Sequence, residues 1–150
     1  MTVINLNQDT PHVEVKLNDK TYTVYANDKT MGIISQILDF YDKFQSKLSD
    51  IQNVNSDESI DYSKEINDIF ASAKKKFTGM LDELLNEPGI GEKLWKQKHG
   101  STEYTIQAVT AIQDGLMRAR EDYARQQQQE INKQFPVNKV KKLRHAKSNQ

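Results

Sequence analysis

Two amphipathic helical patterns, separated by a chain breaker, dominate the segment from Ile60 to Tyr123 and constrain the fold more than any other feature. Apolar residues recur at helical spacing on both sides of the breaker, whose sequence is Asn86-Glu87-Pro88-Gly89-Ile90-Gly91. A helix with one apolar stripe depends on packing that stripe against another element. The sequence therefore predicts a helical domain in which these helices pack on further elements.

The first of these helices, predicted over about residues 59–86, has the clearest stripe in the chain. Its apolar face comprises Ile66, Ile69, Phe70, Ala73, Phe77, Met80, Leu81, Leu84 and Leu85. The Pro88-Gly89 dipeptide is expected to end the helix. A short helix over about 91–98 follows, with Leu94 and the single tryptophan, Trp95, turned inward.

A second long helix is predicted over about residues 101–130. Gly100 is expected to cap the end of the short helix, and Ser101 to cap the start of the long one. The apolar stripe of the long helix is Thr105, Val109, Ile112, Leu116, Ala119 and Tyr123. Beyond it a run of four glutamines favours helix without supplying a packing face, so we expect an exposed helical extension.

The first part of the chain alternates in the manner of β-strands. Residues 12–26 predict a hairpin that turns at Asn18-Asp19-Lys20. Two sets of apolar residues fall on one face of it: Val13, Val15 and Leu17 before the turn, and Tyr22, Val24 and Ala26 after it. The segment Val3–Leu6 is a candidate for a third strand.

A helix over about residues 29–51 is predicted to follow the hairpin. Asp28 or Thr30 can cap its start. Its inward stripe is expected to be Ile34, Ile37, Leu38, Tyr41, Phe44 and Leu48. The whole pattern indicates an α+β fold that is mainly α, with a hairpin, three main helices and one short helix.

Composition favours one domain with a modest core. At 150 residues, 36% apolar and with a mean hydropathy of −0.79, the chain suits a single domain over 12–125, an N-terminal arm over 1–11 and a flexible tail over 131–150. The absence of cysteine excludes disulfides, thiolate metal sites and cysteine nucleophiles. Neither a signal peptide nor a transmembrane stretch is recognisable, so we expect a protein of the cytoplasm with no membrane partner.

Charge is distributed unevenly along the chain. Of 21 basic and 21 acidic residues, six basic and no acidic ones follow Glu130, which leaves residues 1–130 with 15 basic against 21 acidic and a net charge of −6. The basic tail includes Lys139, Lys141, Lys142 and Arg144. These residues are candidate contacts for nucleic acid or for a protein partner, although a solvated, mobile end is the commoner reason for such a block.

Chemistry-bearing residues are not arranged as an active site. The three histidines, His12, His99 and His145, lie far apart in the sequence and lack metal-ligand spacing. The glycines before Lys93 lack the spacing and the hydroxyl residue of a phosphate-binding loop, and they follow a helix. The sequence therefore predicts a protein that is not an enzyme and that has no catalytic, metal or cofactor site.

Three successive features carry a family resemblance. They are the helix segment Phe77-Thr78-Gly79-Met80-Leu81-Asp82-Glu83-Leu84-Leu85, the turn and short helix Gly89-Ile90-Gly91-Glu92-Lys93-Leu94-Trp95, and the capped helix from Ser101. Over roughly Val13 to Tyr123, this pattern resembles the small tail assembly chaperones of long-tailed, siphovirus-type bacteriophages and prophages of Gram-positive bacteria.

The resemblance implies a noncatalytic role in tail morphogenesis. A protein of this kind would bind the tape-measure protein, keep its apolar helices from aggregating and help recruit tail-tube subunits. It would act in the cytoplasm of the bacterial host. Whether it forms a homo-oligomer stays open. The expected partner-binding residues are Phe77, Met80, Leu81, Leu84, Leu85, Ile90, Leu94 and Trp95. Two other readings stay open: a nucleic-acid-binding or regulatory protein that uses the basic tail, and a structural component of the virion.

Overall fold

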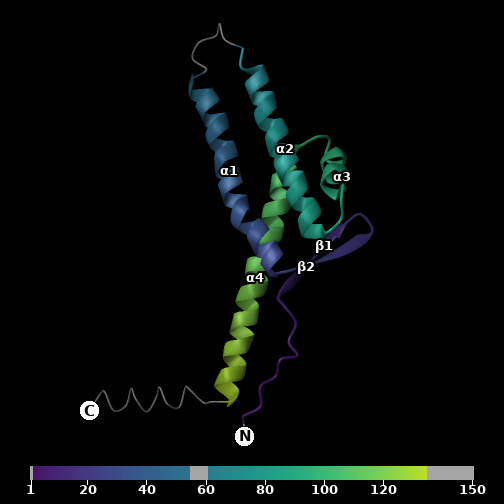
Figure 1. The fold of residues 1–150 in the computed structure, drawn as a ribbon, viewed down its shortest axis with the longest axis vertical. Coiled ribbons are helices and arrows are strands. Elements are labelled where there is room, and N and C mark those ends of the chain that lie inside the picture. Colours follow the sequence, from purple (N-terminus) through teal and green to yellow (C-terminus); the bar gives the residue numbers. More distant parts are fainter. Residues whose placement is uncertain (1, 55–60, 135–150) are drawn as a thin grey trace, which may run out of the picture.

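The computed structural model describes residues 2–54 and 61–134. It contains an antiparallel hairpin of β1 (His12–Leu17) and β2 (Lys20–Tyr25), followed by α1 (Asp28–Val54), α2 (Ser63–Leu85), α3 (Ile90–Gln97) and α4 (Thr102–Gln134) (Figure 1). The mainly α, α+β class predicted from the sequence is confirmed.

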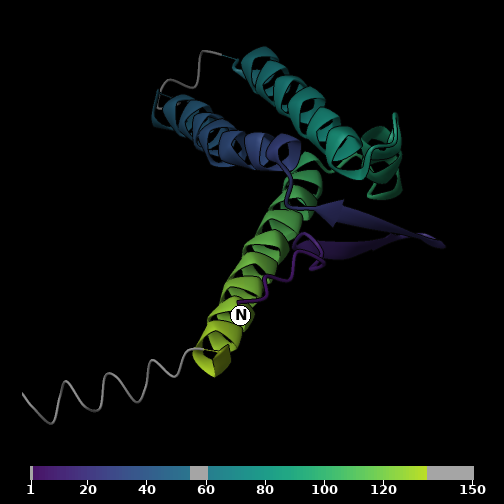
Figure 2. The same ribbon diagram turned by 60° about the horizontal axis from the view of Figure 1, so that its bottom comes forward.

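Helices α1 and α2 lie side by side as an antiparallel pair that projects to one end of the molecule (Figures 1 and 2). Helix α4 crosses their base and continues beyond them toward the other end. Helix α3 packs on α2 and α4, while the hairpin lies between α4, which contacts β1, and α2, which contacts β2. The core lies where these elements meet. Its most deeply buried members are Phe77, Ile37, Leu81, Leu116, Val24, Val109 and Thr105.

The hairpin forms as its alternation predicts. Asn18 and Asp19 make a two-residue turn, with Asn18 in the left-handed conformation at φ 57°. Asparagine adopts this conformation more readily than most residues, because its short polar side chain can hydrogen-bond locally. Lys20, which the sequence placed in the turn, is the first residue of β2 instead. Segment Val3–Leu6 does not form a third strand and is exposed to solvent.

Two helix starts show which side chains act as caps. The Tyr104 N–H donates to Ser101 Oγ at 3.1 Å, as predicted for α4. At α1, the prediction of Asp28 or Thr30 as the cap is wrong. The Thr30 N–H donates to Asn27 Oδ1 at 2.9 Å, so the cap lies one residue before Asp28.

The stripe of α1 also differs at one position. Leu38, predicted to face inward, is 59% exposed, whereas Ile33 and Thr30 are buried. A helix turns by about 100° per residue, so Leu38 is rotated away from the buried Ile37 and lies beyond the margin of the packed face. Three helix bounds also differ from prediction: α1 reaches Val54, α2 begins at Ser63 and α4 extends to Gln134.

The turn between α2 and α3 is organised by Asp82. Its carboxylate accepts hydrogen bonds from the N–H groups of Gly89, at 3.0 Å, and Gly91, at 2.7 Å. Asn86, in the left-handed conformation, ends α2 before Pro88 is reached. Gly91 lies so close to α2 that a Cβ there would be 2.2 Å from the Thr78 carbonyl oxygen. The glycine turn therefore serves packing, and a carboxylate already occupies the first N–H groups of α3.

The N-terminal arm runs from the start of β1 alongside the projecting part of α4 (Figures 1 and 2). Gln8 Nε2 donates to Glu130 Oε2 at 3.0 Å, which joins the two segments. The large apolar residues of the arm, Val3, Ile4 and Leu6, are between 71% and 86% exposed.

Candidate functional site

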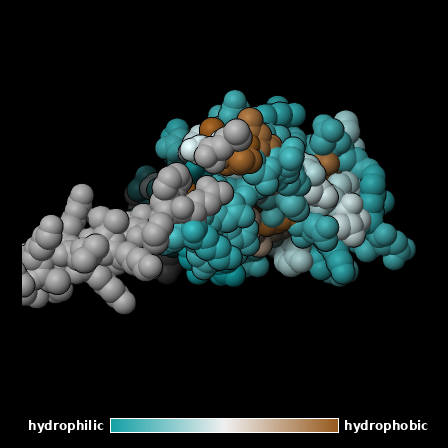
Figure 3. All heavy atoms as spheres, turned by 90° about the horizontal axis from the view of Figure 1, so that it is seen from below, coloured by the Kyte–Doolittle hydropathy of each residue, from teal (hydrophilic) through white to brown (hydrophobic). Residues whose placement is uncertain are grey.

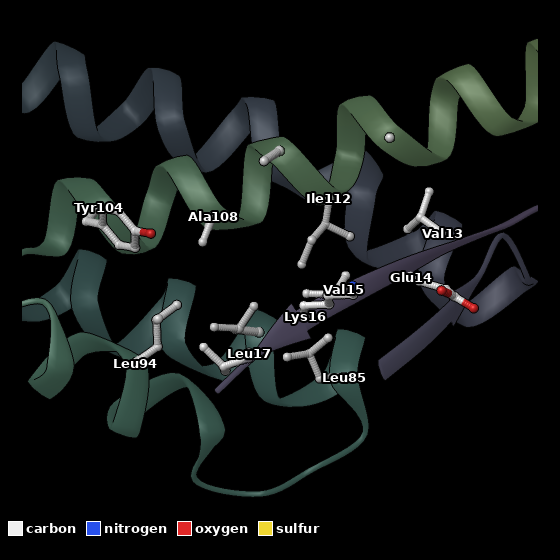
Figure 4. Close-up of a pocket in the computed structure, with 13 residues that line it drawn as sticks. Val13, Glu14, Val15, Lys16, Leu17, Leu85, Leu94, Tyr104, Ala108 and Ile112 are labelled. Carbon is white, nitrogen blue, oxygen red and sulfur yellow. The ribbon is translucent and has the colours of Figure 1, made fainter. Parts of the chain in front are cut away.

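An apolar groove of about 400 Å³ lies between β1 and the first half of α4 (Figure 4). We call it the β1–α4 groove. Three elements besides α4 contribute to it: β1 supplies one wall, and α2 and α3 supply the floor. Its apolar lining is Val13, Val15, Leu17, Leu81, Leu85, Leu94, Tyr104, Ala108, Ala111, Ile112 and Gly115. An engineered apolar cavity of about 150 Å³ accommodates benzene, so this groove has room for two aliphatic side chains.

The groove is narrow at one end and open at the other. Where α4 passes β1 at the narrow end, a Cβ on Gly115 would lie 3.2 Å from Val13 Cγ1. Toward the other end, the residues opposite the strand are Ala108 and Tyr104, with Leu17 and Leu94 below them (Figure 4). Tyr104 is 39% exposed at this end. Small residues on α4 therefore keep the space beside the strand unfilled.

The backbone of β1 has a free edge along this groove. Opposed residues of an antiparallel pair alternate between hydrogen-bonded and non-hydrogen-bonded pairs. The Ala26 N–H donates to the Pro11 carbonyl at 2.8 Å, and counting from this pair places Glu14 and Lys16 at non-hydrogen-bonded positions. Their N–H and C=O groups point away from β2. Both residues border the groove, and within the described part of the chain β2 is the one strand that pairs with β1.

The partner-binding residues expected from the sequence lie mainly inside the molecule. Seven of them are buried in the core: Phe77, Met80, Leu81, Leu84, Leu85, Ile90 and Leu94. Their packing positions α2 and α3 under the hairpin. Leu81, Leu85 and Leu94 also reach the floor of the β1–α4 groove, so they are placed to meet a ligand there. A partner-binding role for the set stays a prediction.

Trp95, the eighth residue, is half-buried on a different face from the groove. Lys74 Nζ lies 3.7 Å from the centre of its ring, and the indole Nε1–H donates to Thr102 Oγ1 at 3.3 Å. Lys74 also pairs with Glu92 at 3.1 Å. Trp95 thus joins α3 to α2 and to the start of α4. The basic-tail candidates Lys139, Lys141, Lys142 and Arg144 lie outside the described residues.

Polar contacts from β2 and the hairpin tip fix the hairpin to the α2–α3 turn and to α3. The Tyr22 hydroxyl donates to Glu87 Oε2, and Lys20 Nζ lies 2.9 Å from Glu87 Oε1. These contacts, the tyrosine hydroxyl first and the lysine second, hold the pKa of the Glu87 carboxyl below its usual value. At the hairpin tip, Gln97 Nε2 donates to Asn18 Oδ1 at 3.1 Å. Strand β2 is therefore tied by polar side chains to the α2–α3 turn, whereas β1 packs on α4.

Other surfaces offer less organised chemistry. His12 stacks at an angle on Tyr25, with ring centres 5.2 Å apart, and His99 is an exposed residue of the turn before α4. Within residues 2–54 and 61–134, no group of three or more histidine, aspartate or glutamate side chains is placed to hold a metal ion. None of the described helices has the length and apolar character needed to cross a membrane.

Seen from the end where the N-terminus lies, the surface is mostly hydrophilic, with a few hydrophobic patches (Figure 3).

Sequence reasoning missed the β1–α4 groove. The alternating strand and the helical stripe were both recognised, but the space between them was not predicted. The available signal was the run of small residues on α4 facing β1: Ala108, Ala111 and Gly115.

Comparisons of the chain with protein-family models, with curated proteins and with solved structures find no match.

Proposed function

We propose that this protein is a noncatalytic assembly chaperone that binds an apolar helical segment of a client protein in the β1–α4 groove. The observation that carries the proposal is the incomplete cover of the core beside β1. There, Val15 and Leu17 are only half-buried and face Ala108 across unfilled apolar space. Apolar side chains of a client would complete the packing that the chain itself leaves unfinished.

The client that the sequence resemblance suggests is the tape-measure protein of a siphovirus-type phage, with tail-tube subunits recruited afterwards. An amphipathic helix presents apolar side chains at every third or fourth position, and such a helix can lay them into a groove of this kind. Burial of two aliphatic side chains contributes roughly 3 to 6 kcal/mol before the costs of association, which are of the order of 4 to 15 kcal/mol. One groove alone thus favours weak, reversible binding, which suits a chaperone that must release its client.

Co-expression tests the proposal. The tape-measure protein, or its helical part, should become more soluble when it is produced with this chain, and the two should copurify. A different helix-rich protein that aggregates alone serves as the control for general solubilisation. Absence of a soluble complex with the tape-measure protein, or equal rescue of the unrelated protein, would count against the proposed role.

Deleting residues 135–150 separates the proposal from its main rival. The groove is built from residues of the body, so the truncated chain should still copurify with the client after nuclease treatment. A nucleic-acid-binding protein that relies on its basic tail would instead lose a salt-sensitive complex on truncation. Binding of nucleic acid by the full chain, together with no binding of the client by either form, would favour the rival.

A further inference from the structure

We propose that, in the absence of a client, the N-terminal arm of a second copy of this chain adds to the free edge of β1, with Ile4 and Leu6 in the β1–α4 groove. The inference rests on two parts of the molecule that lack a packing or pairing partner within the described residues. One is a strand edge that borders an apolar groove. The other is an exposed apolar arm. Strand addition of this kind joins backbone groups along an edge and places alternate side chains in pockets.

The arm has the composition that the groove requires. Residues 2–8 carry no charged side chain, so the arm can enter an apolar groove without burying an unpaired charge. Ile4 and Leu6 are two residues apart and share one face of an extended strand, while Val3 and Asn5 lie on the other. The groove has room for two aliphatic side chains, as its volume shows. The exposed strand edge from Glu14 to Leu17 matches the length of Val3–Leu6.

The occupant is a second copy because the arm of the same chain is directed elsewhere. From Pro11 the arm runs alongside the projecting half of α4, whereas the groove lies beside the first half of that helix (Figures 1 and 4). The Gln8–Glu130 hydrogen bond lies along that path. Reciprocal exchange of arms between two copies would bury both arms and close a two-fold dimer, the commonest form of symmetric assembly.

Self-association of the purified chain, measured by sedimentation over a range of concentrations, tests the inference without any client. The double variant Ile4→Asp/Leu6→Asp should raise the concentration needed for assembly at least about tenfold, because it removes two buried aliphatic side chains. The matched control, Asn5→Asp/Asn7→Asp, adds the same charges to the opposite face and should assemble nearly as the wild type does. A monomeric wild type, or equal loss in both variants, would overturn the inference.

The strand edge can be tested from the other side with Lys16→Pro. Proline at this position removes an N–H that does not belong to the β1–β2 ladder, so the hairpin should tolerate it while the edge loses a donor. Assembly should weaken and the circular dichroism spectrum should be retained. If the variant unfolds, the arm variants still decide the question.

A cross-linking experiment locates the contact directly, because the chain has no cysteine of its own. When Leu6→Cys and Ala108→Cys chains are mixed under oxidising conditions, a disulfide should join the two different chains. Ala71→Cys, at an exposed position of α2 outside the groove, is the control partner and should give little product. Equal cross-linking of both partners would contradict placement of the arm in the groove.

One consequence rests on the proposed function. If the client uses the same groove, adding it should dissociate the self-assembled chain. Self-association that is lost in Ile4→Asp/Leu6→Asp but indifferent to the client would support the arm contact and contradict the client site. Client binding by a chain that is always monomeric would support the client site and contradict the arm contact.

Discussion

The two strands of the hairpin face the same core yet are covered to different extents. On β2, Val24 and Tyr22 are 1% and 8% exposed, whereas their partners across the ladder, Val13 and Val15 on β1, are only half-buried. Register and side-chain type are therefore not what separates them. The difference lies in the neighbouring elements: β2 packs on α2, whereas β1 packs on small residues of α4 that leave a groove beside it.

A hairpin can thus be fixed through one strand while the outer edge of its other strand stays available for binding. Glu87 ties Lys20 and Tyr22 of β2 to the turn before α3. That attachment holds the hairpin in place while the backbone edge of β1 remains open. An exposed edge is a hazard for aggregation unless it is used or protected, so its presence beside an apolar groove supports a binding role for β1.

The largest expected change in the free energy of unfolding comes from Gly91, where α3 packs on α2. Gly91→Ala places a Cβ 2.2 Å from a backbone oxygen of Thr78, and we expect a loss of about 3 kcal/mol in the free energy of unfolding. Gly79→Ala is the control, since nothing lies within 4 Å of a Cβ there. It should stabilise the helix by about 0.5 to 1 kcal/mol. Urea denaturation measures both, and similar effects in the two variants would contradict the close approach.

The cross-strand pair Val24 and Val13 offers the most direct test of unequal cover. Val24→Ala should cost about 2 kcal/mol in unfolding free energy, because a fully buried side chain is truncated. Val13→Ala should cost about half as much or less, since its side chain is already partly in water. Chemical denaturation of the two variants supplies the comparison. Equal losses would mean that β1 is as well covered in solution as β2.

The attachment of β2 should depend on pH. Because the folded state lowers the pKa of Glu87, its contribution is present above the unfolded pKa of about 4.3 and is lost as pH falls through the lower folded pKa. The same contacts with Glu87 raise the pKa of Tyr22 and of Lys20, so their contributions are present below about 10 and are lost as pH rises through their folded pKa values.

Thermal melts of the wild type and of Glu87→Gln check this dependence. The wild type should melt higher at pH 7, and the difference should narrow in acid as Glu87 becomes protonated and in strong base as Lys20 and Tyr22 lose their protons. A difference that stays constant from pH 3 to pH 7, roughly spanning the usual glutamate range, would show that the ionised carboxylate does not hold the hairpin.

The smallest effect is expected at Leu38, a large apolar residue that is exposed on α1 and lies outside the groove. Leu38→Gln should change the unfolding free energy by no more than about 0.5 kcal/mol and leave client binding as it is. The variant thus shows whether client binding depends on any exposed apolar side chain or only on those in the groove. A marked loss of client binding would extend the binding surface to α1.

Much of the fold follows from local patterns in the sequence. Period-two alternation located the hairpin and its inward face, helical stripes located α2 and α4, and Ser101 was recognised as a cap because serine favours that position. These features are set by residues near one another in the chain. Helix ends were less exact, and Asn27 was missed as a cap because neighbouring polar residues are all plausible candidates.

Features that depend on distant residues were not predictable. The contacts of the Asp82 carboxylate with the N–H groups of Gly89 and Gly91 arise only once α3 folds back on α2, so no local pattern indicates them. The groove was not predicted for the same reason. A stripe shows which residues prefer burial, but whether Val15 is covered depends on Ala108, which lies on a different element and far along the chain.

Binding of the client in the β1–α4 groove is best tested by calorimetry, which measures the affinity of an apolar tape-measure helix for three forms of the chain. Ala108→Glu places a charge in the β1–α4 groove, and Ala71→Glu places the same charge on an exposed part of α2. We expect Ala108→Glu to weaken binding at least about tenfold, while Ala71→Glu binds as the wild type does. Unchanged binding by a folded Ala108→Glu chain would contradict binding of the client in the groove.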